Sequence, residues 1–184
     1  MRWIAIGIGL TISLVAGSLP LGAQRPVSVG VAAGVAMPFG TLRDEANPGL
    51  RALATLDLAL PEMPVSLRID GSYDRFGFKS TPPGAAGSGT GALTITSGSI
   101  SLALGSLTTP RAVAPYAIAG VGIHRIGCAG RSDCEVLERM GWNAGAGVRL
   151  GLFGLRGFIE ARLHRVPGPV TDLDYVPLTV GVLF

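Results

Sequence analysis

The sequence predicts an all-β fold, an eight-stranded antiparallel up-and-down transmembrane β-barrel preceded by a cleaved signal peptide. Two observations lead to this prediction. Hydrophobic residues make up 48% of the 184 residues and charged residues only 15%, with 28 glycines, which is unusual for a water-soluble protein. After the N-terminal segment, apolar residues recur at every second position in eight separate stretches, and this is the period of a strand with one apolar face.

The N-terminal segment has the pattern of a secretory signal peptide. Arg2 supplies the positive charge, residues 4–15 form an apolar stretch, and residues 21–24 form a small-residue cleavage site. An uncleaved membrane anchor is the alternative interpretation, but the apolar stretch is short and leads directly into strand-like sequence. We therefore expect residues 1–24 to be a signal peptide and residues 25–184 to form one β-barrel domain.

Each alternating stretch has one apolar face and one face of small or polar residues. In the first of them Val29 and Val31 share a face, while Ser28 and Gly30 share the other. The eight stretches are residues 27–37, 50–60, 65–74, 97–104, 116–124, 142–150, 156–164 and 175–184. Lengths of about nine to eleven residues suit a tilted strand that crosses a bilayer. Because an open sheet would leave backbone groups unpaired in hydrocarbon, eight such strands predict a closed barrel.

The connections between these stretches alternate between short and long. The short ones are residues 61–64, 106–112 and 153–155, and the long ones are residues 38–49, 77–91, 127–139 and 166–174. An even number of strands puts both termini of an outer-membrane barrel on the periplasmic side, where the turns are short. We therefore expect the long connections to be extracellular loops, and the second of them, rich in Pro, Gly and Ser, to lack regular structure.

Aromatic residues near the strand ends suggest interface girdles, as bilayer-spanning barrels have. The girdle residues predicted at the extracellular ends are Tyr73, Phe76, Phe78 and Trp142, and those at the periplasmic ends are Tyr116, Phe153 and Phe184. The last strand ends on Phe184, with apolar residues at alternate positions before it. This ending resembles the terminal signal by which outer-membrane barrels are recognised, so Phe184 is the expected assembly signal and the barrel-assembly machinery an expected partner.

Diffuse strand motifs carry a resemblance to a known family. They are residues 34–40, 115–122, 143–149, 157–162 and the last strand. Through them the chain, from about Val27 to Phe184, resembles the outer membrane protein β-barrel family, the small barrels of the OmpA, OmpX and OmpW type. The resemblance implies the fold, an integral position in the bacterial outer membrane and contact with its lipids. It implies no single function, because the family includes adhesive, protective, structural and small-solute proteins.

The polar faces of the strands place many charged residues in the predicted lumen. They are Arg51, Asp57, Arg68, Asp70, Asp74, Arg149, Arg156, Glu160, Arg162 and His164. The interior of an eight-stranded barrel is just wide enough to be filled by side chains. Since an isolated buried charge is costly, we expect a paired, hydrogen-bonded network that closes the lumen. The alternative is a narrow polar pathway.

Two cysteines lie in the third long connection. Cys128 and Cys134 are the only cysteines of an exported chain, so they are expected to form one disulfide that closes a short loop and contributes about 2 kcal/mol at most. A metal site there is not predicted, because two thiols without a nearby histidine fall short of the four ligands of structural zinc. No cofactor is predicted either.

Several classes of function are disfavoured. The net charge is only +3, with Lys79 the one lysine, so no basic stripe suggests nucleic-acid binding. Some small outer-membrane barrels act on lipids, and this chemistry needs a base beside a nucleophile. Neither His124 nor His164 is followed two residues later by a serine. A couple between Glu160 and His164 is conceivable, but both residues fit the lumen network, so no enzyme is predicted.

Three hypotheses of function remain. The favoured one is a structural or surface-interaction barrel whose extracellular loops carry any binding. The second is a channel or transporter for small or apolar solutes. The third is a soluble, lipocalin-like barrel, which would need an apolar interior and a polar exterior.

Overall fold

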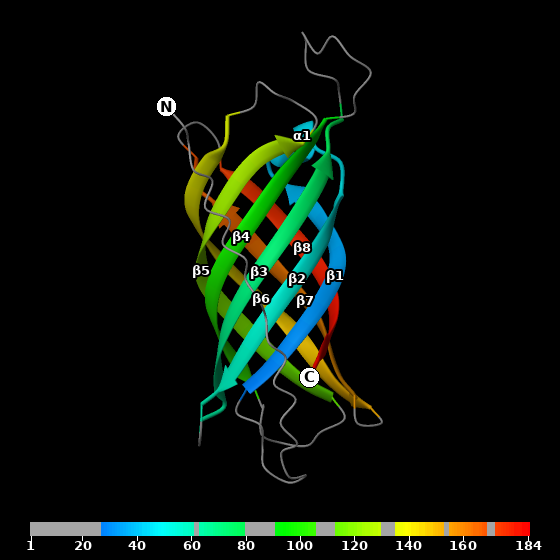
Figure 1. Cartoon of the computed structure of the whole chain (residues 1–184), viewed down its shortest axis with the longest axis vertical. Helices are drawn as coiled ribbons and strands as arrows, with labels where there is room; N and C mark the ends of the chain where they lie inside the picture. Colours follow the sequence, from blue (N-terminus) through cyan, green and yellow to red (C-terminus); the bar gives the residue numbers. More distant parts are fainter. Residues whose placement is uncertain are drawn as a thin grey trace, which may run out of the picture.

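The computed structural model describes residues 27–60, 63–79, 91–105, 113–129, 135–152, 155–168 and 172–184. Eight antiparallel strands form one closed barrel in which each strand pairs with its neighbours in sequence, and β1 pairs with β8 (Figure 1). The strands are β1 (Val27–Phe39), β2 (Gly49–Ala59), β3 (Val65–Gly77), β4 (Ala92–Gly105), β5 (Val113–Ala129), β6 (Leu137–Leu152), β7 (Leu155–Val166) and β8 (Leu173–Leu183). The predicted fold class and strand number are confirmed. The predicted signal peptide, residues 1–24, lies outside the described residues.

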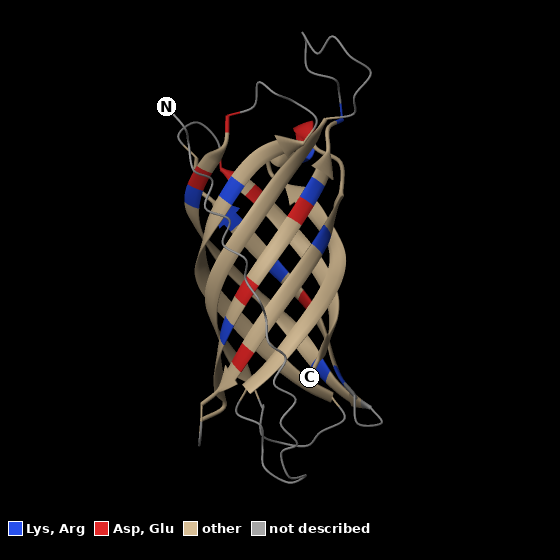
Figure 2. Ribbon diagram, in the orientation of Figure 1, with Lys and Arg blue, Asp and Glu red and all other residues tan. Residues whose placement is uncertain are grey.

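The period-two alternation of the sequence becomes an inside and an outside. Along β3, for example, buried and exposed side chains alternate over most of the strand. The outward side chains are mainly apolar, and Val31, Val121 and Val180 each expose 55–58% of their surface. Charged residues occur along the strands (Figure 2), and Arg68, Asp70 and Glu160 are among those whose side chains are buried inside the barrel. This arrangement is what a bilayer requires of a barrel that crosses it.

Strands β3, β4, β5 and β6 run three or more residues further at one end than the sequence predicted, and the reason is a change in the lining of the barrel. At one end of the barrel the interior becomes apolar, so Ile95 on β4 points inward beside polar neighbours and breaks the simple alternation. β5 and β6 continue to pair beyond the predicted strands, as far as the pair Ile126 and Leu137. β3 reaches Gly77, beyond the predicted end at Asp74.

A short helix, α1 (Leu42–Glu45), follows β1 within residues 38–49, which were predicted only as a long extracellular loop. We call the end of the barrel that carries it the α1 end and the opposite end, where β1 begins and β8 finishes, the terminal end (Figure 1). Gly40 makes the turn into α1 with a positive φ of 58°, which glycine adopts at little cost. No helix in the described part of the chain is long and apolar enough to span a membrane.

The α1 connection lies over the interior and forms a cap. We define the cap as Leu42, Ala46, Phe76 and Ile95, which are all buried and pack together. Backbone bonds hold it in place, with the amide of Asn47 donating to the carbonyl of Gly77 over 2.8 Å and that of Lys79 to Glu45 over 3.0 Å.

The aromatic girdle prediction is only partly correct. Tyr73, Trp142 and Phe184 expose 40–63% of their surface on the outside. Phe76 and Tyr116, however, are 0% and 4% exposed and point into the barrel, so assigning them to a girdle was wrong. The Tyr116 ring fills space beside the long side chain of Arg68, and the Phe76 ring is part of the cap, where it packs with Leu42 and Ala46. Phe153 lies outside the described residues.

Candidate functional site in the barrel interior

The interior side chains form two layers beneath the cap. The ion-pair layer lies toward the terminal end and consists of Asp57, Arg68, Asp70, Tyr116, Arg149, Glu160 and Arg162. The histidine layer lies between the ion-pair layer and the cap and consists of Arg51, Asp74, Ser97, His124, Asn143, His164 and Tyr175. The strand register sets this order, because inward residues further along β3 from Arg68 to Asp74 lie successively closer to the α1 end.

Arg68 is the centre of the ion-pair layer. Its side chain is fully buried, and Nε and Nη2 each donate to Asp57 over 2.8 Å in a bidentate pair. Its third nitrogen, Nη1, donates to Glu160 Oε2 over 2.6 Å. The guanidinium also lies 5.3 Å from the ring centroid of Tyr116, within the range of a cation–π contact.

Glu160 gathers three donors from three directions. Besides Arg68, it accepts hydrogen bonds from Arg162 Nε over 2.5 Å and from the Tyr116 hydroxyl over 2.7 Å. Arg162 in turn donates to Asp70 over 2.7 Å. All of these side chains are nearly inaccessible to solvent, so their charges are compensated within the protein.

Three of the ion pairs cross the whole width of the barrel. Arg68 with Glu160 and Arg162 with Asp70 both join β3 to β7, and Arg149 with Asp57 joins β6 to β2 over 3.0 Å. In a ring of eight strands, strands four places apart stand on opposite walls. These pairs therefore bridge the lumen at its full diameter.

Glycines on the neighbouring strands make room for the large interior side chains, since Gly147 pairs with Tyr116 and Gly181 with Phe158. A Cβ atom on Gly147 would lie 2.5 Å from the ring and hydroxyl of Tyr116, and one on Gly181 would lie 2.5 Å from the Phe158 ring. The glycine-rich motif at residues 143–149 thus serves packing of the interior against Tyr116.

The histidine layer is less completely paired. Arg51 Nη1 donates to both carboxylate oxygens of Asp74, over 3.0 and 2.9 Å. Ser97 Oγ is 2.8 Å from His124 Nδ1, and His164 stacks on Tyr175 with centroids 4.9 Å apart. Several buried atoms of this layer have no hydrogen-bond partner within the described protein: Arg51 Nε, His124 Nε2, Asn143 Nδ2, His164 Nδ1, His164 Nε2 and the Tyr175 hydroxyl.

The predicted lumen residues divide between the layers. Asp57, Arg68, Asp70, Arg149, Glu160 and Arg162 come together in the ion-pair layer, and Arg51, Asp74 and His164 lie in the histidine layer. Arg156 stands apart near the terminal end, where it donates to Ser28 Oγ over 2.9 Å. His164 touches rings rather than carboxylates, because the layer around it holds Tyr175 and His124.

The predicted lumen network lacked five interior residues that complete these layers. Tyr116, Ser97, His124, Asn143 and Tyr175 lie on the small or polar face of their strands, and all five are buried. The signal was therefore present in the period, but these side chains carry no full charge and were not counted. Among the described residues, no group of three or more His, Cys, Asp or Glu side chains could hold a metal ion.

The two other predicted sites lie at the ends of the barrel. Cys128 lies near the end of β5, but Cys134 falls outside the described residues, so the disulfide stays a prediction. The Phe184 side chain is 63% exposed, and its backbone exchanges hydrogen bonds with Val29 over 2.8 and 3.2 Å. Its role as an assembly signal likewise stays a prediction.

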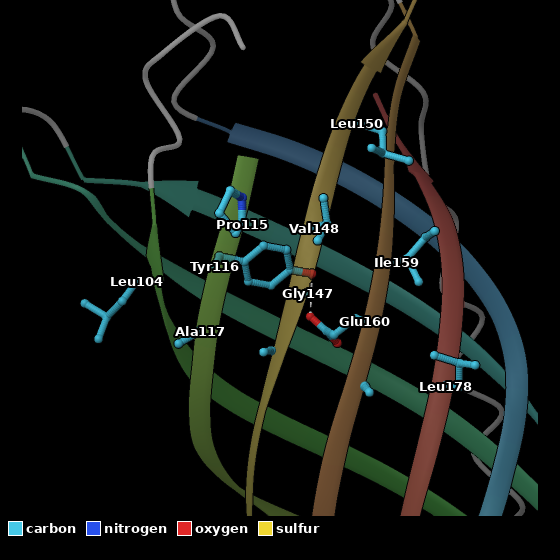
Figure 3. A pocket seen from close by; sticks show the side chains of 12 residues that line it. Leu104, Pro115, Tyr116, Ala117, Gly147, Val148, Leu150, Ile159, Glu160 and Leu178 are labelled. Carbon is cyan, nitrogen blue, oxygen red and sulfur yellow. Dashed lines mark hydrogen bonds between the residues drawn. The ribbon is translucent and has the colours of Figure 1, made fainter. Parts of the chain in front are cut away.

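A hollow of about 770 Å³ lies on the outer wall beside β5, β6 and β7 (Figure 3). Outward apolar side chains such as Leu104, Ile159 and Leu178 line it. At its floor Gly147 leaves Tyr116 and Glu160 close to the surface, and these two groups bond to each other. The hollow therefore offers an apolar surface and no free reactive group among these lining residues.

The chain is similar in fold to solved outer-membrane barrels. Neisserial surface protein A matches with a TM-score of 0.64 and 16% identity over 86% of this chain and 96% of that one. The N-terminal barrel domain of Pseudomonas aeruginosa OprF gives 0.49 and 19%, over 85% and 97%. The Yersinia pestis protein Ail gives 0.48 and 13%, over 86% and 96%. Only the first score is high enough to carry the argument about fold.

No protein-family model matches the chain, and no curated protein is significantly similar to it. The fold is that of the small eight-stranded outer-membrane barrels. Together with the apolar exterior, this fold is that of a barrel that crosses a lipid bilayer. The soluble, lipocalin-like hypothesis is wrong for the same reason, since it required an apolar interior and a polar exterior.

Proposed function

We propose that this protein is a structural or surface-interaction barrel of the outer membrane. Its lumen is closed by the ion-pair layer, and the connections at the α1 end, which face the cell exterior, carry any binding. The observation that supports this proposal is the set of three ion pairs that bridge opposite walls. The protein then acts through its shape and its exposed end rather than by passing solutes.

The energetics of the ion-pair layer favour closure. Removing one partner of a buried ion pair costs about 3–5 kcal/mol, because the other charge stays desolvated and unpaired. Separating the two charges without removing either leaves both of them in this state. Arg68 has carboxylates on two walls, so a solute would have to break several such contacts at once. The cap adds an apolar barrier at the α1 end, with Phe76 and Ile95 fully buried.

A hydrolytic role is not proposed. Ser97 and His124 form a serine–histidine contact across strands, a pairing that sequence spacing alone did not reveal. Both side chains, however, are 0–6% exposed and lie beneath the cap, out of reach of a lipid acyl group. A nucleophile needs substrate within bonding distance, so this pair is better explained as part of the packing.

Planar-bilayer conductance tests the closed lumen. We expect the purified, refolded protein to show no steady channel activity. The double variant Arg68→Ala with Glu160→Ala removes a central bridge and should conduct small ions in discrete steps. Arg165→Ala on the outer wall is the matched control and should stay silent. Steady single-channel conductance of the wild type, equal to that of the double variant, would favour the channel hypothesis instead.

The surface-interaction part needs a separate experiment. Residues 40–48, which include α1, are replaced by a short turn, and folding is checked by the shift between boiled and unboiled samples on a gel. Cells that carry the folded variant should lose attachment or aggregation phenotypes that the wild-type protein confers. Retention of every such phenotype after replacement of this and the other connections at the α1 end would contradict the proposal.

A further inference from the structure

The fold brings together the only two histidines of the chain. His124 lies on β5 and His164 on β7, and their ring centroids are 5.8 Å apart with the planes at 88°. The two side chains are 0% and 1% exposed. Forty residues of sequence separate them, so the contact exists only because the barrel closes.

Three of the four ring nitrogens lack a partner. His124 Nδ1 lies 2.8 Å from Ser97 Oγ, but His124 Nε2 and both nitrogens of His164 make no hydrogen bond within the described protein. A buried polar atom without a partner costs about 1–3 kcal/mol. The neighbouring Tyr175 hydroxyl also makes no hydrogen bond within the described protein, so three unpaired ring nitrogens and one phenol oxygen lie in the same layer.

We propose that His124 and His164 bind a divalent transition-metal ion such as Zn²⁺ or Cu²⁺ inside the barrel, beneath the cap. Imidazole nitrogen is a preferred ligand of these ions. A metal–nitrogen bond of about 2.0–2.1 Å puts the ion about 3.2 Å from each ring centroid, so rings that share an ion have centroids about 5–6.4 Å apart. The observed 5.8 Å falls in this range. Ordinary edge-to-face packing has a similar separation, and the unpaired nitrogens are what favour an ion.

The surroundings hold both rings in place. Ligand histidines usually bond through their other ring nitrogen to a neighbouring polar group, and Ser97 occupies this position for His124. Tyr175 fixes the plane of His164 by stacking at 14°. Gly141 keeps space open at His124 Nε2, because a Cβ there would lie 3.0 Å from this atom.

The charge of the layer is compatible with a cation. Arg51 is the one cationic side chain among the residues that define this layer, and Asp74 neutralises it through a 2.9 Å ion pair. The Tyr175 hydroxyl is the third protein donor, and water completes the coordination. Because no carboxylate or thiolate takes part, we expect Zn²⁺ and Cu²⁺ to bind and Mg²⁺, which prefers oxygen ligands, not to bind.

Copper binding by the purified protein tests this site. The protein is expressed without a polyhistidine tag, since two histidines are the whole natural complement. It is refolded into detergent micelles after chelator treatment, with Cu²⁺ added before folding so that entry past the cap is not required. We expect one Cu²⁺ per barrel and an electron paramagnetic resonance spectrum with hyperfine coupling from two nitrogens. No stoichiometric binding, or a spectrum without nitrogen coupling, would overturn the proposal.

Substitutions assign the site to its residues. His164→Phe keeps the stacking on Tyr175 and removes both nitrogens, and we expect at least a tenfold loss of Cu²⁺ affinity; His124→Phe should give the same loss. Arg156→Ala, near the terminal end and outside both layers, is the control and should bind as the wild type does. Each variant is used only if its unboiled band shows a folded barrel. A folded His124→Phe/His164→Phe double variant that binds Cu²⁺ like the wild type would refute the site.

A second measurement uses the wild type alone, in case the variants do not fold. A ligand that binds only the folded state raises the unfolding temperature. We expect Zn²⁺ to raise the temperature at which the unboiled band disappears, and Mg²⁺ at equal concentration to leave it unchanged. Equal effects of the two ions on this temperature, or no effect of either, would contradict the metal site and would mean that water is the hydrogen-bond partner of the ring nitrogens.

Discussion

The two polar layers of the interior solve the problem of buried charge differently. In the ion-pair layer, Arg68, Asp57 and Glu160 are each held by two or more partners from different walls. In the histidine layer a single ion pair, between Arg51 and Asp74, stands beside rings with unpaired nitrogens. In the first layer every charged group has an oppositely charged partner, although Asp70 Oδ1, Arg149 Nε and Arg162 Nη2 make no hydrogen bond within the described protein, so this layer is suited to closing the barrel. The second has spare donor capacity, so it is suited to holding a guest.

The largest expected loss of stability comes from breaking the ion-pair layer. Arg68→Leu leaves Asp57 and Glu160 with fewer partners in a buried place, and we expect the free energy of unfolding to fall by about 3–5 kcal/mol. Arg51→Leu deprives only Asp74 and should cost less. Both are measured by urea unfolding in lipid vesicles, followed by the fluorescence of Trp142. Equal losses would remove the distinction between the layers.

The two interior tyrosines sharpen the same comparison. The Tyr116 hydroxyl donates to Glu160 over 2.7 Å, and a hydrogen bond to a charged group contributes about 1.5–3 kcal/mol, so Tyr116→Phe should lower stability by this amount. The Tyr175 hydroxyl has no partner within the described protein, and Tyr175→Phe should be neutral or stabilising without metal. The measurement is the urea midpoint of each variant. A larger loss for Tyr175→Phe would show that this hydroxyl is bound in the folded state.

Glycine substitutions test how tightly the ion-pair layer is packed. Gly147→Ala puts a Cβ 2.5 Å from the Tyr116 ring, and overpacking of this kind costs about 1–3 kcal/mol. Gly98→Ala is the matched control in a strand, because a Cβ there meets nothing within 4 Å. We expect the control to unfold at the wild-type urea concentration or above it. If both variants lose the same stability, backbone effects rather than packing would explain the loss.

The smallest expected effect lies outside the barrel. Arg165 on β7 donates to Asp174 over 2.7 Å, but its side chain is 41% exposed. Water reaches the guanidinium and salt screens the pair, although Asp174 is only 9% exposed, so we expect Arg165→Ala to lower stability less than any of the destabilising interior substitutions and less still in high salt. Thermal unfolding at low and high salt measures both effects. A loss as large as that of Arg68→Leu would contradict the division between inside and outside.

The strand pattern was readable from the sequence because lipid and lumen impose opposite chemistry on alternate residues. The inward assignment of Arg68, Asp70 and Glu160 follows directly from this period. The pattern fails where the lining changes character, as at Ile95 and Phe76, which are apolar and inward because they pack against Leu42 of α1 and Ala46. Helix α1 has four residues and no periodic signal of its own, so only packing of Leu42 onto the interior defines it.

Pairing across the barrel could not be predicted for a different reason. Period two gives the face of a residue but not its height, and height depends on the stagger with which the barrel closes. The contact between His124 and His164, and the bridge from Arg68 to Glu160, both depend on this stagger. The sequence therefore predicts which residues face the interior, but not which of them contact one another.

The seam between β1 and β8 also determines how this chain can fold. Ten residue pairs join the two strands, among them Gly30 with Leu183, which lie at opposite ends of the sequence. Contacts between such distant residues form late, because the chain must first be brought together against a large loss of entropy. Until they form, the sheet has two open edges that hydrocarbon cannot satisfy. Insertion and closure should therefore occur as one cooperative event, with no stable membrane intermediate that contains only some of the strands.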